Sequence, residues 1–158
     1  MTDNERADAA NAHDYIGLVC LAPDKRYVLF TGSREWTDYL TIYSVVRKLH
    51  VLLGSFTALH GGARGADTFV GLAARSNKLP ERAERVTSEE WEKGGKSAGH
   101  YRNSRMLAMK PLMVVAFWDG SSRGTLDTIR KAVNIFRLPT VIYRLDQWTD
   151  NNDERGER

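Results

Sequence analysis

Short apolar runs alternate with stretches of helical period along the central part of the chain. Residues 27–31, 56–60 and 112–118 have the length and the β-branched and aromatic content of buried strands. The stretch after the first run has apolar residues at helical spacing, namely Leu40, Tyr43, Val46, Leu49 and Leu53. Such alternation is typical of repeated βα units that build a parallel sheet.

This pattern predicts an α/β, Rossmann-like three-layer fold with a mostly parallel sheet of about five strands. Strands are expected at 27–31, 56–60, 82–86, 112–118 and 140–144, and helices at about 38–53, 66–77, 103–109 and 124–136. The inward face of the last helix is predicted at Leu126, Ile129, Val133 and Phe136. Residues 87–100, rich in Gly, Ser, Lys and Glu, are expected to be a loop, with a lid over a site and a plain surface loop as alternatives.

Composition changes at both ends of the chain. Residues 1–24 have a formal charge of −4 and residues 146–158 one of −3, so the interval between them carries +10 in a chain of net charge +3. An excess of that size favours an anionic partner, although a solvated basic face would have the same count. We expect one domain over 25–146 between disordered acidic segments, 1–24 and 147–158.

The cysteine content and the lack of long apolar runs narrow the function classes. Cys20 is the only cysteine, so neither a disulfide framework nor a multi-cysteine zinc site is available, and an incidental or buried thiol is expected. Residues 1–14 do not have the features of a secretory signal, and no apolar run approaches membrane-spanning length. A cytoplasmic protein without membrane partners is therefore expected. No spacing of His, Cys and Asp predicts a transition-metal site, and a divalent cation carried by a phosphate is left open.

Glycines and arginines follow three of the predicted strands. The segments are 32–34 after the first strand, 61–67 after the second and 120–125 after the fourth, and 102–103 opens the helix before the fourth strand. In a doubly wound sheet these segments meet at the carboxyl ends of the strands, where helix N-termini attract anions. Glycine lets a phosphate approach the backbone, and a guanidinium binds it bidentately. Each segment alone is ordinary turn chemistry, but their shared edge predicts an anion site.

The predicted ligand-binding residues are Gly32, Ser33, Arg34, Trp36, Gly61, Gly62, Arg64, Asp67, Arg102, Asn103, Gly120, Ser121, Ser122, Arg123, Gly124 and Thr125. Arg34, Arg64 and Arg123 are expected to hold phosphates. Trp36 is expected to stack on a base, while Trp118 is expected to be half in the core.

Three side chains are candidates for catalysis, namely Asp67, His100 and Asp127. Asp67 is interpreted either as a ribose-hydroxyl acceptor or general base, or as a helix-stabilising residue or partner of Arg64. His60 ends a buried strand, so a satisfied core histidine is the favoured interpretation.

Two phosphate-binding signatures are incomplete. Gly94-Gly95-Lys96-Ser97 matches the end of a P-loop, but Glu90 stands where the first glycine is required and no buried strand precedes the segment. The dinucleotide fingerprint is absent after the first strand, which disfavours NAD-dependent hydride transfer.

These motifs together resemble the SLOG superfamily of Rossmann-like nucleotide-binding proteins, and within it the small YspA-like branch. The similarity lies in Gly32-Ser33-Arg34 with Trp36 and Asp38, in the string from His60 to Asp67, in Ala98-Gly99 with Arg102-Asn103 and Met106, and in Gly120 to Thr125. It covers about 26–144. The resemblance implies a five-stranded domain that binds a nucleotide or nucleotide derivative, in a bacterial or phage conflict or signalling setting.

One related branch, the phosphoribohydrolases, carries a catalytic glutamate in its last glycine motif. Aligned on Gly124-Thr125, this chain has Thr128 at that position, with Asp127 one residue earlier. On a helix one residue is a rotation of about 100°. The resemblance therefore implies a phosphate cradle more strongly than a catalyst.

Three functions follow as alternatives. The first is binding, with or without processing, of a nucleotide-derived small molecule, and the chemistry expected if processing occurs is N-glycosidic hydrolysis of nucleoside monophosphates. The second is binding of single-stranded nucleic acid, supported by the charge and the loop aromatics. The third is an interaction module with no nucleotide response. The sequence leaves open whether the chain forms a homo-oligomer.

Overall fold

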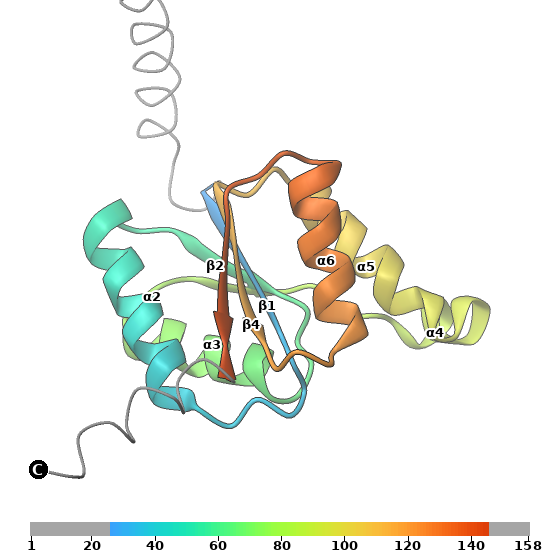
Figure 1. The fold of residues 1–158 in the computed structure, drawn as a ribbon, viewed down its shortest axis with the longest axis horizontal. Helices are drawn as coiled ribbons and strands as arrows, with labels where there is room; N and C mark the ends of the chain where they lie inside the picture. Colours follow the sequence, from blue (N-terminus) through green and yellow to red (C-terminus); the bar gives the residue numbers. More distant parts are fainter. Residues whose placement is uncertain (1–25, 146–158) are drawn as a thin grey trace, which may run out of the picture.

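A computed structural model describes residues 26–145, so the expectations for 1–24 and 147–158 and for Cys20 lie outside the described residues. Its centre is a sheet of five parallel strands in the order β3-β2-β1-β4-β5. The strands are β1 (Tyr27–Gly32), β2 (Thr57–His60), β3 (Glu81–Ala83), β4 (Met113–Trp118) and β5 (Thr140–Arg144). This sheet confirms the predicted Rossmann-like α/β fold (Figure 1).

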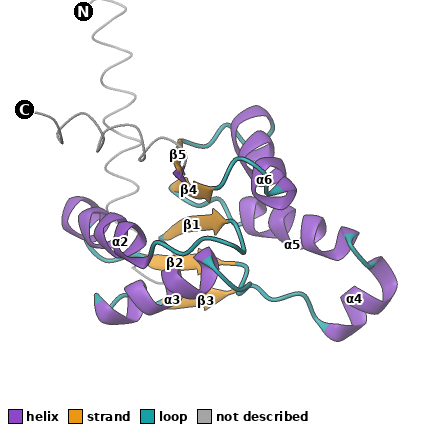
Figure 2. Ribbon diagram, turned by 60° about the horizontal axis from the view of Figure 1, so that its bottom comes forward, coloured by secondary structure: helices purple, strands orange, loops and turns teal. Residues whose placement is uncertain are grey.

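Helices cover both faces of the sheet. The helices α2 (Tyr39–Leu53) and α3 (Ala66–Ser76) pack together on one face, and α5 (Ser97–Ala108) and α6 (Arg123–Asn134) pack together on the other. The short helix α4 (Ser88–Gly94) contacts α5 and projects away from the sheet (Figure 2). None of the described helices has the length and apolar content needed to cross a bilayer.

The core follows the two-residue period of the strands. In β1, Val28 and Phe30 belong to the cluster under α2 and α3, whereas Leu29 belongs to the cluster under α5 and α6. All three side chains are fully buried. Burial on both faces explains why β1 and β4 are continuous apolar runs.

Two predictions about the helices were wrong. Residues 87–100 are largely helical, because Thr87 caps α4 through a reciprocal capping box with Glu90 and α5 begins at Ser97. On α6, Val133 was expected to face inward but is 44% exposed, whereas Ile129 is buried as expected. The buried residues are Ile42, Val45 and Val46 on α2, and Thr125, Thr128, Ile129 and Ala132 on α6.

The position of β1 in the sheet sets the location of the site. β1 lies between β2 and β4, so the segments that leave β1, β2 and β4 all start at neighbouring carboxyl ends. The connection from β3 to β4 passes from one side of β1 to the other and contains α4 and α5. Ligands of doubly wound sheets bind at such a crevice.

Candidate functional site

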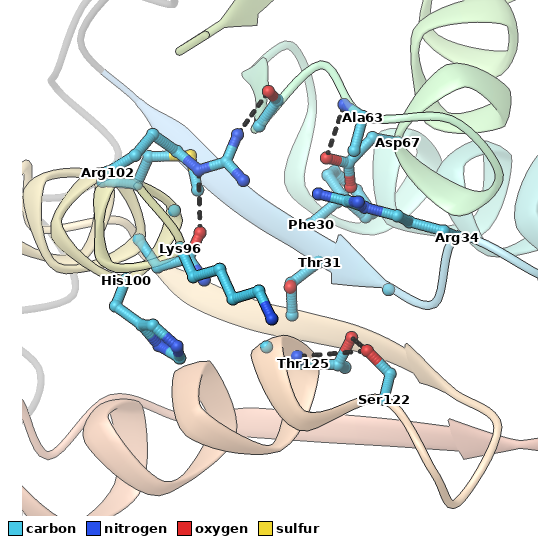
Figure 3. Close-up of a pocket in the computed structure, with 16 residues that line it drawn as sticks. Phe30, Thr31, Arg34, Ala63, Asp67, Lys96, His100, Arg102, Ser122 and Thr125 are labelled. Atoms are coloured by element: carbon cyan, nitrogen blue, oxygen red, sulfur yellow. Dashed lines mark hydrogen bonds between the residues drawn. The ribbon is translucent and has the colours of Figure 1, made fainter. Parts of the chain in front are cut away.

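A cavity of about 220 Å³ opens at this edge of the sheet (Figure 3). Its wall combines the ends of β1 and β2 with the N-terminal turns of α3, α5 and α6. The lining residues that were predicted to bind ligand are Gly32, Arg34, Gly61, Asp67, Arg102, Asn103, Ser122, Gly124 and Thr125, and His100 lines the cavity as well. The structure therefore brings residues of all four predicted segments together.

Three cationic side chains line the cavity, namely Arg34, Lys96 and Arg102. Within residues 26–145, no carboxylate lies at salt-bridge distance from any of them. Arg102 donates instead to neutral groups: the backbone carbonyl of Gly61, the backbone carbonyl of Glu84 at 3.2 Å and the side-chain carbonyl of Asn103 at 2.8 Å. Burial lowers the pKa of Arg102, but a guanidinium remains protonated. The cavity wall thus carries three cations and one carboxylate, Asp67, and this carboxylate acts on Arg102 electrostatically without a salt bridge to it.

Asp67 supplies the carboxylate of the cavity wall. It lies in the first turn of α3, is only 6% exposed, and accepts a hydrogen bond from the backbone N–H of Ala63 at 3.2 Å. Burial raises its pKa above the ordinary value, although His60, the Ala63 N–H and Arg102 oppose the shift. Such a group either accepts or donates a hydrogen bond to a ligand hydroxyl, depending on its protonation.

The N-terminus of α6 forms the opposite wall. Ser122 caps the helix, and its hydroxyl oxygen accepts from the Thr125 N–H at 3.4 Å. Asp119 accepts hydrogen bonds from the N–H groups of Ser121 at 2.9 Å and Ser122 at 2.8 Å. Partial burial raises the pKa of Asp119, but these hydrogen bonds outweigh that effect, so the pKa lies below its ordinary value. The first helical N–H groups beyond the cap point along the axis toward the cavity, where they suit an anion.

His100 and Asp127, two of the catalytic candidates, lie in contact. Nδ1 of His100 is 3.0 Å from Oδ2 of Asp127, and Lys131 approaches the same oxygen at 2.7 Å. Partial burial raises the pKa of Asp127, but the hydrogen bonds from Lys131 and His100 outweigh it, so the pKa lies below its ordinary value. In neutral His100 the proton therefore sits on Nδ1, which leaves Nε2 as an acceptor.

His60 is a satisfied core histidine, as expected. It is 2% exposed, and its Nδ1 accepts from the Gly62 N–H at 3.1 Å. Nε2 must then carry the proton of the neutral ring and donates to Oε1 of Glu81 at 3.0 Å.

The other predicted ligand-binding residues do not line this cavity; they are Ser33, Trp36, Gly62, Arg64, Gly120, Ser121 and Arg123. Arg64 is 73% exposed and pairs with Glu35 on the neighbouring loop. Ser33 is fully buried and ties the loops together, because its carbonyl accepts from both the Trp36 and the Ala66 N–H at 3.2 Å.

The prediction that Trp36 is free to stack on a base was wrong. Its side chain is 3% exposed and packs against Phe117 with ring centroids 5.4 Å apart. The indole N–H donates to the Asp38 carbonyl at 2.9 Å. Trp118, by contrast, is half-buried as predicted, and its indole N–H donates to the Ser122 carbonyl at 3.1 Å.

Sequence reasoning missed several residues of the cavity wall: Phe30, Thr31, Ala63, Lys96, Gly99 and Met106. Lys96 is the most informative of them because its side chain extends into the cavity in Figure 3. It belongs to the incomplete P-loop signature, which lacks a preceding strand. Its basic character next to two glycines was the available signal, but only the position of α5 reveals what it faces.

Two comparisons with known proteins found similarity to this chain. A family model described as "YspA, cpYpsA-related SLOG family" matches residues 26–92. "Gene 61 protein" of Mycobacterium phage D29 is 37% identical over 112 residues, which is 68% of this chain and 88% of the phage protein. The comparison with solved structures found no match.

Proposed function

Because this chain belongs to the YspA, cpYpsA-related SLOG family, we propose that its cavity binds a nucleotide or a nucleotide-derived small molecule. Membership of this family indicates a nucleotide-related binding domain. A relative encoded by a phage is compatible with a role in bacterial or phage conflict or signalling, which stays a prediction.

The observation that carries the proposal is the charge of the cavity wall. Arg34, Lys96 and Arg102 face the cavity without an ion-pair partner among the described residues, against the carboxylate of Asp67. A bound phosphate would neutralise this excess and accept charge-assisted hydrogen bonds, which are about twice as strong as neutral ones. Arginines and lysines that only keep a surface solvated would be spread over that surface and would not gather in one cavity.

Within this cavity the ligand groups have distinct partners. The N-terminal turn of α6 and Lys96 suit the phosphate, because backbone N–H groups and an ammonium meet there. Asp67, on the opposite wall, suits a ribose hydroxyl.

Binding, rather than hydrolysis, is the activity that the wall supports best. The Thr128 side chain is fully buried, and its hydroxyl donates to the Gly124 carbonyl at 3.0 Å. A hydroxyl held in that way supplies no general base at the position where the phosphoribohydrolases have a glutamate.

The proposal is tested by calorimetry and thermal unfolding with AMP, ADP-ribose, NAD, a cyclic dinucleotide and a short single-stranded oligonucleotide. We expect at least one of the small nucleotides to bind and to raise the Tm. Arg34→Ala and Lys96→Ala should each weaken its Kd by roughly tenfold or more, since a lost hydrogen bond to a charged group costs about 1.5–3 kcal/mol.

Matched controls lie nearby. Lys93 is exposed and pairs with Glu89 at 2.6 Å, and Arg64 pairs with Glu35, both outside the cavity wall. Lys93→Ala and Arg64→Ala should leave the Kd within about twofold of the wild-type value. Binding of the oligonucleotide alone, with a steep salt dependence, would favour the nucleic-acid alternative. No binding of any probe would contradict the proposal.

A further inference from the structure

A second hollow of about 220 Å³ adjoins the cavity. It shares Arg34, Gly61, Ala63, Gly99 and Arg102 with the cavity wall, so the two spaces are neighbours. Its other lining residues are Gly62, Arg85, Val86 and Trp91. We call it the outer hollow, and the cavity described above the inner cavity.

Packing does not explain why Trp91 lines the outer hollow. Its side chain is 51% exposed, whereas the tryptophan beside the first loop, Trp36, is 3% exposed. No residue of α4 is buried, so the indole does not serve the core. An exposed aromatic face next to cationic groups is the usual platform for a nucleobase.

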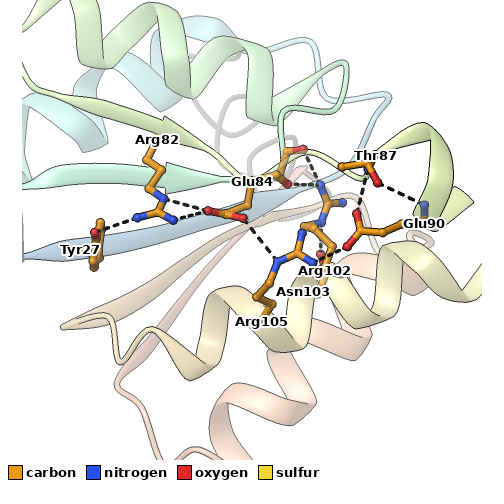
Figure 4. Close-up of polar contacts among 9 residues, drawn as sticks. Tyr27, Arg82, Glu84, Thr87, Glu90, Arg102, Asn103 and Arg105 are labelled. Atoms are coloured by element: carbon orange, nitrogen blue, oxygen red, sulfur yellow. Dashed lines mark hydrogen bonds and ion pairs between the residues drawn. The ribbon is translucent and has the colours of Figure 1, made fainter.

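The helix α4, to which Trp91 belongs, is anchored through polar contacts of Thr87 and Glu90 (Figure 4). Thr87 and Glu90 form the capping box of α4, and Glu90 also accepts from Arg105 of α5 at 2.6 Å. Arg105 in turn lies 3.4 Å from a carboxylate oxygen of Glu84, just after β3. The helix that carries Trp91 is therefore held relative to the sheet, which reduces the entropy lost when a ligand binds beside it.

Charge distinguishes the two sides of Trp91. The outer hollow has three arginines and no carboxylate in its lining, and Arg85 is held over the loop after β2 by donating to the Gly62 carbonyl at 2.8 Å. Another hollow that Trp91 lines, of about 280 Å³, includes the carboxylate of Glu92 together with Val86, Thr87 and Ser88. An electron-rich base attached to a phosphate fits the arginine side better, because that side is continuous with the inner cavity.

The volumes point the same way. Sites for drug-sized ligands occupy roughly 300–1,000 Å³, so neither space reaches that range alone, at about 220 Å³ each. Together they reach it.

We infer that the outer hollow is a nucleobase subsite, in which Trp91 stacks on the base of a nucleotide whose sugar phosphate occupies the inner cavity. The inference rests on the proposed function and extends it. The order of groups matches the wall: phosphate at α6 and Lys96, ribose at Asp67, and base beyond Gly61 and Arg102. Stacking tolerates all four bases, so recognition by Trp91 does not depend on base identity.

The test compares ligands with and without a base. Dissociation constants of AMP, GMP, CMP, UMP and ribose 5-phosphate are measured by calorimetry for the wild type and for Trp91→Ala and Trp91→Phe. We expect Trp91→Ala to weaken every nucleotide by about 5- to 100-fold and to leave ribose 5-phosphate unchanged. Trp91→Phe should retain most of the affinity because it keeps an aromatic face.

Tyr101→Ala is the matched control, since Tyr101 is an aromatic residue on α5 that is 71% exposed and lines neither space. It should bind all five compounds as the wild type does. If the nucleotides bind Trp91→Ala as tightly as the wild type, the base subsite is wrong while the proposed function stands. If no nucleotide and no sugar phosphate binds the wild type, the proposed function itself fails.

Discussion

Oδ2 of Asp67 accepts a hydrogen bond from the backbone N–H of Ala63 at 3.2 Å, although the residue is only 6% exposed. The bond ties the N-terminal turn of α3 to the loop after β2. It also places a buried carboxyl group in the wall of a cavity that is otherwise rich in positive charge.

Replacing Asp67 with Asn should change stability in a pH-dependent way. The folded-state pKa of Asp67 is raised by burial above the ordinary 3.8. As the pH rises from 3.8 to that folded value, the unfolded chain releases its proton first, so the wild type loses stability. Asp67→Asn lacks this loss, so its Tm relative to the wild type should increase over that interval and then level off. A tenfold difference in proton affinity between the folded and the unfolded chain corresponds to about 1.4 kcal/mol.

Asp127→Asn should change stability with pH in the opposite direction to Asp67→Asn. The pKa of Asp127 is lowered because its hydrogen bonds from Lys131 and His100 outweigh partial burial. Its contribution to stability is therefore present above the ordinary value and is lost as the pH falls through the folded value. This variant should be less stable at pH 7, by roughly 0.2–1 kcal/mol, and should converge with the wild type in acid. Parallel pH profiles of the two variants would contradict both assignments.

Gly65→Ala should destabilise the fold by roughly 1–3 kcal/mol. Gly65 has φ of +74°, and a β carbon there would overlap the carbonyl of Arg34, which belongs to the neighbouring loop. The measurement is the midpoint of urea unfolding. Gly99→Ala is the matched control, because a β carbon at that position has no heavy atom within 4 Å. In the helix α5 it should raise stability by about 0.5–1 kcal/mol, so equal effects of the two changes would refute the steric argument.

Glu90→Gln should loosen α4. Backbone and side-chain hydrogen bonds, first from Thr87 and then from Arg105, lower the pKa of Glu90, so it stays ionised at neutral pH. The amide can still cap the helix but loses the ion pair with Arg105. Amide hydrogen exchange across 88–94 should accelerate several-fold, while α6 should be unaffected. Glu89→Gln breaks only the Lys93 pair within α4 and should have a smaller effect; an equal effect would show that Arg105 does not anchor this helix.

The strands β1, β2 and β4 were predictable because burial on both faces leaves a strong local signal, as in Val114 to Phe117. β3 lacks this burial, and it covers Glu81–Ala83 where 82–86 was expected. The helix α4 was also readable in principle, since Thr87 and Glu90 have the spacing of a capping box. Residues 87–100 were nevertheless predicted to be a loop, because their Gly, Ser, Lys and Glu content is typical of one.

The direction of single side chains was less predictable. Arg34 and Arg64 occupy similar glycine loops, but only Arg34 lines the cavity, because Glu35 draws Arg64 outward. Trp36 follows a glycine loop, where an exposed aromatic side chain could stack on a base. It packs instead against Phe117, which is distant in sequence. Lys96 reaches the cavity through the placement of α5, which also depends on contacts distant in sequence.

The connection between β3 and β4 is the part of the fold in which homologues can vary without changing the sheet. Since two other strands separate its ends in the sheet, this segment has to bridge the sheet regardless of ligand, and it carries Trp91, Lys96 and Arg102 on the way. Insertions or deletions in α4 would alter the reach and chemistry of the proposed ligand site while leaving every strand pairing intact. Homologues with the same sheet are therefore expected to differ most in the size of the molecule that they accept.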